Sequence, residues 1–195
     1  MNNTIDYYNM SADAFVATTK YVDFSALQND FMSKIKTGGH IIDLGCGSGR
    51  DSKAFMKNGY SVEAIDGSKE LCKLASEYIG QAVKCVYFQD YIPTNCADGI
   101  WACASLLHLH YDDIKAVVSR LANYLNKDGC FYMSFKYGDY EGERNGRFFT
   151  DMNEDRLVDV LTGTGLRIDS MYISQDVRPG RENEKWINVF CVKNM

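Results

Sequence analysis

Three glycines at alternate positions follow a short apolar run, and an acid stands two residues before the first of them. The pattern is Asp43-x-Gly45-x-Gly47-x-Gly49, and Arg50 comes next. Glycine serves where a backbone must turn with a positive φ or come into contact with a ligand, because a side chain would block that approach. The stretch therefore predicts a strand, a tight turn and a helix, with a nucleotide-type cofactor lying over the turn.

The spacing of this turn separates two classes of cofactor. A dinucleotide fingerprint ends in a small residue that lets the helix pack close to the strand. Counted from Gly45, that position holds the bulky Arg50, which speaks against NAD and FAD. The acid Asp43 before the glycines instead gives a pattern that resembles the first motif of class I S-adenosylmethionine (SAM) methyltransferases.

A second acid lies at the end of the next predicted strand, residues 60–65. Asp66 is followed by Gly67 and Ser68, at a distance from the turn that suits a ribose-binding carboxylate. Such a carboxylate can accept hydrogen bonds from both ribose hydroxyl groups. Asp66 can also begin a turn while Ser68 caps the following helix, and both interpretations can hold at once.

Two further predicted strands end in polar residues. Gln89 and Asp90 close a strand over residues 83–88, and an apolar strand over 99–105 ends in Ser105 and runs into His108. In open α/β sheets, ligands bind beyond the carboxyl ends of the strands, where the strand order reverses. We therefore expect Ser105 and His108 beside the reacting group. His108 could accept a proton from an attacking amine or hydroxyl, or simply hydrogen-bond to backbone.

The alternation of strands and helices favours a parallel sheet flanked by helices. The connection over 175–184 is too short for a helical crossover, so the last strand, 185–192, should run antiparallel to its predecessor. The predicted fold class is α/β, a Rossmann-like, seven-stranded, mostly parallel sheet with the last strand antiparallel and helices on both faces. We expect one domain over residues 1–195.

The whole chain resembles a small class I SAM-dependent methyltransferase, and Asp43 to Ser52 with Asn58 to Val62 resemble the tellurite-resistance-type branch. In related enzymes the first segment, here residues 1–37, folds over the cofactor as a helical lid; an amphipathic helix that covers the sheet edge is the alternative. The resemblance implies these cofactor contacts: Asp43, Gly45, Gly47 and Arg50 at the methionyl end; Asp66, Gly67 and Ser68 at the ribose; Gln89 and Asp90 at the adenine; Ser105 near the methyl group; Tyr8 from the lid.

Composition excludes several classes of function. The net charge of −5 disfavours a nucleic-acid partner, and the absence of Asn-Pro-Pro-Tyr disfavours enzymes that methylate the amines of bases. Seven cysteines without a Cys-x-x-Cys pair indicate reduced core residues, and no metal site is expected. No secretory signal is visible and the longest apolar stretch is too short to cross a bilayer, so we expect a cytoplasmic location and no membrane partner.

Basic residues near two predicted loops suggest the chemical class of the molecule that accepts the methyl group. Lys136, Arg147 and Arg178 could pair with a carboxylate or a phosphate, although such charges often serve only solvation. The prediction is a methyltransferase that uses SAM to methylate N, O or S of a small, anionic molecule, with His108 as the candidate base. Methylation of tRNA or protein, and a non-catalytic SAM-binding module, are the alternatives. The oligomeric state stays open.

Overall fold

Seven strands form one sheet in the order β3-β2-β1-β4-β5-β9-β8. The computed structural model describes residues 3–178, 180–181 and 183–193. β9 pairs antiparallel with both of its neighbours, and the other pairings in the sheet are parallel, which confirms the predicted fold class. The strands are β1 (His40–Leu44), β2 (Ser61–Asp66), β3 (Lys84–Cys85), β4 (Ala97–Ala102), β5 (Leu125–Lys136), β8 (Leu166–Gln175) and β9 (Lys185–Lys193).

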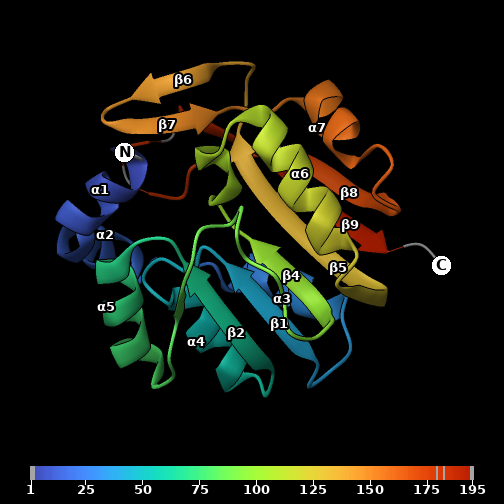
Figure 1. The fold of residues 1–195 in the computed structure, drawn as a ribbon, viewed down its shortest axis with the longest axis horizontal. Coiled ribbons are helices and arrows are strands. Elements are labelled where there is room, and N and C mark those ends of the chain that lie inside the picture. The colour runs from blue at the N-terminus through green and yellow to red at the C-terminus, as the bar shows by residue number, and fades with distance from the viewer. Residues whose placement is uncertain (1–2, 179, 182, 194–195) are drawn as a thin grey trace.

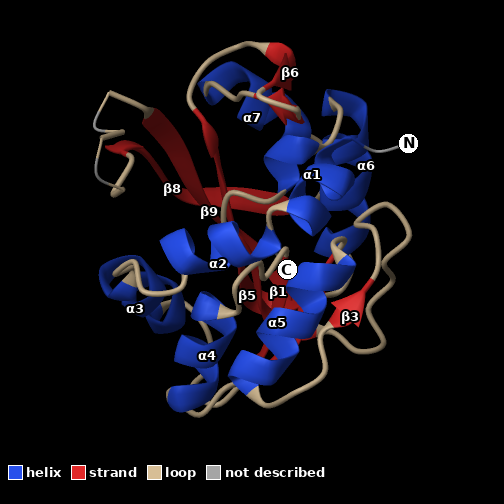
Figure 2. Ribbon diagram, turned by 90° about the vertical axis from the view of Figure 1, so that its left-hand side faces the viewer, coloured by secondary structure: helices blue, strands red, loops and turns tan. Residues whose placement is uncertain are grey.

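Helices cover both faces of this sheet because its strands bury side chains on both sides (Figures 1 and 2). Neighbouring residues of β4 illustrate the alternation. Ile100 packs into the core beneath α6 (Tyr111–Ala122) and α7 (Glu154–Leu161). Trp101 packs into the opposite core beneath α3 (Ser25–Ser33), α4 (Arg50–Lys57) and α5 (Lys69–Ile79). The two layers hold the carboxyl ends of β1, β4 and β5 in place.

The third strand is shorter than predicted. β3 contains only Lys84 and Cys85, whereas the sequence predicted a strand over residues 83–88. β3 lies at the edge of the sheet, and its partner β2 ends at Asp66 opposite Cys85. Residues beyond Cys85 therefore have no strand to pair with, and the chain leaves the sheet.

A β-hairpin occupies part of the segment 137–149 that the sequence predicted as a loop. β6 (Glu141–Arg144) and β7 (Arg147–Thr150) pair antiparallel and form a separate two-stranded sheet. Asn145 and Gly146 connect them with φ of 50° and 75°. Asn-Gly between two strands is a strong hairpin signal, because both residues tolerate the positive φ that a tight hairpin turn needs. The signal was present in the sequence and was missed.

The predicted lid segment, residues 1–37, consists of three helices and their connections, and its residues 1 and 2 lie outside the described ranges. It contains α1 (Asn3–Met10), α2 (Ala12–Thr19) and α3. Figure 1 shows α1 beside the β6–β7 hairpin, where the Phe148 backbone N–H donates to Thr4 Oγ1 at 2.9 Å. None of the helices in the described ranges combines the length and apolar character needed to span a membrane.

Candidate functional site

The glycine turn lies where the strand order reverses. β1 has β2 on one side and β4 on the other, and the turn follows β1 directly. Gly45 has a φ of 89°, and a Cβ on it would lie 2.4 Å from the Cβ of Ser105. Gly47 has a φ of 54°, and a Cβ there would meet the Phe15 ring at 3.1 Å. The turn therefore requires glycine for both conformation and space.

Asp66 is buried and accepts hydrogen bonds from backbone alone. Its carboxylate accepts from the N–H groups of Gly47 and Ser68, both at 2.9 Å. No side chain in the described ranges donates to it, and burial raises its pKa. A buried carboxylate without a side-chain donor, beside a glycine turn, has the acceptor capacity that a ribose diol needs. Ser68 also caps α5 by accepting from the Leu71 N–H at 3.2 Å, so both predicted interpretations hold.

α1 lies over the residues that follow Asp66. Ser68 Oγ donates to Asn9 Oδ1 at 2.7 Å, and a Cβ on Gly67 would lie 2.8 Å from Ile5 Cδ1. These contacts explain why Asp66 is only 9% exposed. The ribose end of the predicted cofactor site is therefore covered by the first helix.

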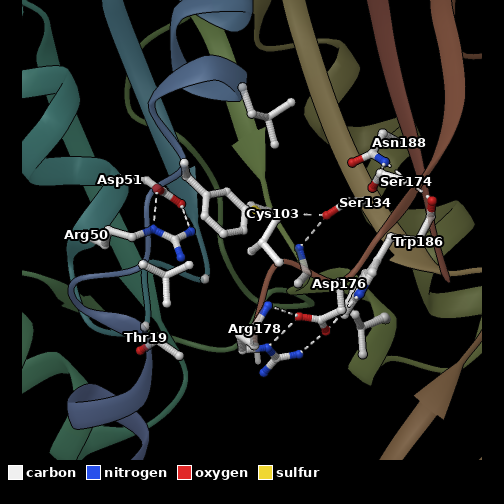
Figure 3. A pocket seen from close by; sticks show the side chains of 18 of the residues that line it. Thr19, Arg50, Asp51, Cys103, Ser134, Ser174, Asp176, Arg178, Trp186 and Asn188 are labelled. Atoms are coloured by element: carbon white, nitrogen blue, oxygen red, sulfur yellow. Dashed lines mark hydrogen bonds and ion pairs between the residues drawn. The ribbon is translucent and has the colours of Figure 1, made fainter. Parts of the chain in front are cut away.

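A cavity of about 380 Å³ extends from the glycine turn to the ends of β5 and β9 (Figure 3). Figure 3 shows Arg50 and Asp51 on one side of it and Ser134, Trp186 and Asn188 on the other. Its volume is typical of a small-molecule site. The aromatic lining residues are Tyr8, Phe15, Phe24, Tyr132, Phe149, Tyr172 and Trp186.

Asp51 joins the glycine turn to the sheet through four hydrogen bonds. It accepts from Gln28 at 2.7 Å, from Arg50 twice at 2.8 Å and from Trp101 Nε1 at 2.9 Å. Burial alone would raise its pKa, but the charge and hydrogen bonds of Arg50 reverse the effect and lower it. Because the guanidinium of Arg50 also stacks on the Phe24 ring, 3.7 Å from its centre, it is held rigidly at the cavity wall.

Asp43 lies beneath the turn and does not line the cavity. It is 2% exposed, and Ser52 Oγ donates to it at 2.5 Å. Burial and the negative charge of Asp51 raise its pKa to about 8. Its observed role is to brace the turn against α4.

His108 is hydrogen-bonded at both ring nitrogens. Phe148 O, which can only accept, lies 2.7 Å from Nδ1, so Nδ1 carries the proton and Nε2 accepts from Tyr8 Oη at 2.9 Å. Burial lowers the pKa of His108 to about 4, and the Phe148 carbonyl only partly offsets this. Both His108 and Tyr8 line the cavity. In this arrangement neither nitrogen is free to take a proton, and His108 positions the Tyr8 hydroxyl.

Two of the three predicted substrate-binding cations are paired within the chain. Lys136 contacts the carboxylate of Glu184. Arg178 Nε donates to Asp176 at 2.9 Å, as Figure 3 shows. Burial would raise the pKa of Asp176, but its bonds with Arg178 lower it to about 2. Arg147, the third, lines the cavity without a carboxylate partner among the described residues.

Comparison with known proteins finds a methyltransferase domain within the chain. Residues 41–129 match a family of methyltransferase domains. The fold superposes on the 1,6-didemethyltoxoflavin-N1-methyltransferase of Burkholderia thailandensis, crystallised with S-adenosylhomocysteine, with a TM-score of 0.75 at 19% identity, covering 98% of this chain and 87% of that one. Residues 41–129 therefore match a methyltransferase domain, and the chain has the fold of that solved methyltransferase. The narrower resemblance to the tellurite-resistance-type branch stays a prediction.

Two other similar proteins bear names that differ in the atom methylated. The ubiquinone biosynthesis O-methyltransferase of Xylella fastidiosa (strain 9a5c) is 30% identical over 117 residues. The match covers 54% of this chain and 46% of that protein, so the chain spans about half the length of that curated relative. The N-methyltransferase of Bradyrhizobium japonicum WM9 has a TM-score of 0.72 at 11% identity, over 96% of this chain and 98% of the other. Their names cover O- and N-methylation, so the family does not identify the acceptor.

Seven of the predicted cofactor contacts do not line the cavity: Asp43, Asp66, Gly67, Ser68, Gln89, Asp90 and Ser105. Gln89 and Asp90 are exposed, because the strand that would have carried them to the sheet edge ends at Cys85, and Gln89 donates to Asp113 at 3.3 Å. Ser105 is buried, and its hydroxyl donates to Leu44 O at 2.5 Å. This bond joins the segment after β4 to the last residue before the glycine turn. The cofactor contacts suggested for these residues stay predictions.

The sequence reasoning missed Asp51 and the polar floor of the cavity. Asp51 directly follows Arg50, and an adjacent acid and base at a cofactor turn was the available signal; it was interpreted only as the start of a helix. On the floor, Tyr132 Oη donates to Asn188 Oδ1 at 2.8 Å. These two residues lie on β5 and β9, 56 positions apart, and no local pattern links them. Within the described ranges, no three His, Cys, Asp or Glu side chains gather as a metal site.

Proposed function

We propose that this chain transfers a methyl group from SAM to a small-molecule acceptor held in the cavity. The carrying observation is Asp66, a buried carboxylate whose donors within the described ranges are backbone N–H groups, beside a turn in which Gly45 and Gly47 have positive φ and a Cβ on Gly45 would collide with Ser105. These features fit a cofactor that carries a ribose and approaches the backbone closely. When bound, SAM supplies a methyl group activated by its sulfonium.

The residues of the chain then have to bind and orient the cofactor and the acceptor, and to exclude water. Asp66 would accept from the ribose hydroxyls, and Gly45, Gly47 and Arg50 would border the methionyl end. The aromatic side chains make part of the cavity wall apolar, which favours a direct displacement by removing competing water. Because α1 covers the ribose end, cofactor entry requires this helix to move, which supports our proposal that residues 1–37 act as a lid.

The structure changes the role that we propose for His108. A base with a pKa of about 4 and two occupied nitrogens removes protons poorly near neutral pH. We infer instead that His108 fixes the Tyr8 hydroxyl, which also accepts a long hydrogen bond from Arg147 and has one lone pair left. An acceptor would arrive unprotonated, as a neutral amine, a thiolate or an acidic hydroxyl.

Calorimetric titration tests the proposal. We expect wild type to bind both SAM and S-adenosylhomocysteine. Two charge-assisted hydrogen bonds contribute about 1.5–3 kcal/mol each, so Asp66→Ala should weaken binding by a factor of at least about 100. Asp128→Asn, at an exposed position, is the matched control and should bind normally. If wild type binds neither ligand, or if Asp66→Ala binds both as well as wild type does, the assignment of this turn to SAM fails.

A further inference from the structure

The charges along the cavity are almost fully compensated. Five basic side chains line it, and four of them face a carboxylate. Arg50 pairs with Asp51, Lys136 and Arg181 with Glu184, and Arg178 with Asp176. Arg147 is the exception, since no carboxylate within the described ranges lies within ion-pair distance of it. The cavity therefore contains one uncompensated guanidinium.

The surroundings of Arg147 are aromatic. Its guanidinium carbon lies 4.6 Å from the centre of the Tyr7 ring and 5.1 Å from that of Phe149. Nη1 makes one long hydrogen bond, 3.4 Å, to Tyr8 Oη. Nε is buried and has no hydrogen-bond partner among the residues that the structure describes. A buried donor left without an acceptor costs about 1–3 kcal/mol, so its retention at a cavity wall calls for an explanation.

We propose that Arg147 is the carboxylate-binding subsite of this cavity and holds the carboxylate of the methyl acceptor. The inference rests on the proposed function. Nε and Nη2 form the edge of a guanidinium that binds a carboxylate with two parallel hydrogen bonds, and Nε, although buried, lacks an acceptor among the described residues. Because Arg147 is the one lining cation without a carboxylate partner within the described ranges and the groups around it are rings, the substrate class is a small, apolar-bodied monocarboxylic acid.

The position of Arg147 favours the acceptor over the cofactor as the source of this carboxylate. The predicted methionyl contacts, Gly45, Gly47 and Arg50, lie on the turn after β1. Arg147 lies on β7 and is tied to Tyr8, which His108 holds from the segment after β4. In an open α/β sheet the reacting group lies beyond the end of such a central strand, so Arg147 stands on the acceptor side.

The test uses two pairs of probes with full-length wild type, Arg147→Met and Arg147→Lys. Benzoate and benzamide have the same ring, and only benzoate carries a carboxylate. S-adenosylhomocysteine and 5′-methylthioadenosine share the nucleoside, and only the former has the methionyl carboxylate. Arg181→Met is the matched control, because it removes another cation of the cavity wall, one that faces Glu184 at 3.8 Å. All affinities are measured by calorimetry, those for benzoate and benzamide both with and without S-adenosylhomocysteine.

We expect wild type and Arg181→Met to bind benzoate at least tenfold more tightly than benzamide. Arg147→Met should lose this preference and Arg147→Lys should retain part of it, while affinity for S-adenosylhomocysteine stays within twofold. If Arg147→Met instead loses S-adenosylhomocysteine but not 5′-methylthioadenosine, the subsite binds carboxylates but serves the cofactor, which overturns the acceptor assignment.

The proposal is wrong if wild type binds benzoate no better than benzamide, or if Arg147→Met behaves as wild type with all four probes. Failure of the proposed function looks different. In that case wild type binds neither nucleoside, whereas the benzoate preference of the free protein can still be present and still depend on Arg147.

Discussion

Replacing Asp51 by Asn tests whether the Arg50–Asp51 pair stabilises the cofactor turn. The carboxylate is 9% exposed and accepts four hydrogen bonds, two at each oxygen, from Gln28, Arg50 and Trp101. An amide in its place keeps one acceptor oxygen and turns an NH₂ group toward two donors. Arg50 would also lose its counter-ion while it remains largely buried.

The expected magnitude follows from the two lost bonds. Hydrogen bonds to a charged group contribute about 1.5–3 kcal/mol each, and removal of one partner of a buried ion pair costs about 3–5 kcal/mol. We therefore expect Asp51→Asn to lower the free energy of unfolding by about 4 kcal/mol. For a chain of this size that corresponds to a decrease in Tm of roughly 10 °C.

Urea unfolding at pH 6 measures this change, with circular dichroism as the signal and the slope m unchanged. The control is Asp128→Asn, an exposed position with a φ of 62°, which Asn also tolerates, and its cost should stay within about 0.5 kcal/mol. A loss below about 1 kcal/mol in Asp51→Asn would refute the reasoning, because it would mean that the buried network contributes no more than an exposed pair.

The same experiment has a pH dependence of known sign. The folded pKa of Asp51 is lowered, so the stability that its charge provides is present above the unfolded pKa, about 3.9. That stability is lost as the pH falls through the folded pKa. Asn cannot titrate. The difference between wild type and Asp51→Asn should therefore shrink in acid below about pH 4.

Two further predictions concern the turn and the histidine. Gly45 and Gly59 have similar φ, 89° and 85°, but a Cβ on Gly45 would lie 2.4 Å from Ser105 whereas one on Gly59 would meet nothing within 4 Å. Gly59→Ala should cost about 1–2 kcal/mol in urea unfolding and Gly45→Ala at least about 2 kcal/mol more; equal losses would contradict the packing described here. By NMR, His108 should titrate near its lowered pKa of about 4, and Tyr8→Phe should raise that pKa because a hydrogen bond to the neutral ring is lost. An ordinary histidine pKa in wild type would contradict its burial.

The sequence was informative wherever the signal is local. Alternating and helical periodicity located the seven strands and most helices, because burial on one face repeats along the chain. The glycines after β1 and the acid after β2 revealed the cofactor turn, since each residue there serves a backbone geometry that few other residues permit. The sequence analysis was wrong about the length of β3 and missed the β6–β7 hairpin. The first depends on where the partner strand ends, and the second came from overlooking Asn145-Gly146.

Only the tertiary structure decides which side chains come into contact. Tyr8 and His108 are in contact although they are 100 residues apart in the chain, and Lys136 and Glu184 are in contact although they are 48 residues apart. Composition lists the charges without saying which neutralise each other, because pairing depends on the distance between side chains and not on their order in the chain. The sheet brings the ends of β5 and β9 together and thereby compensates Lys136. The hairpin places Arg147 among rings instead, so its charge remains available for a ligand.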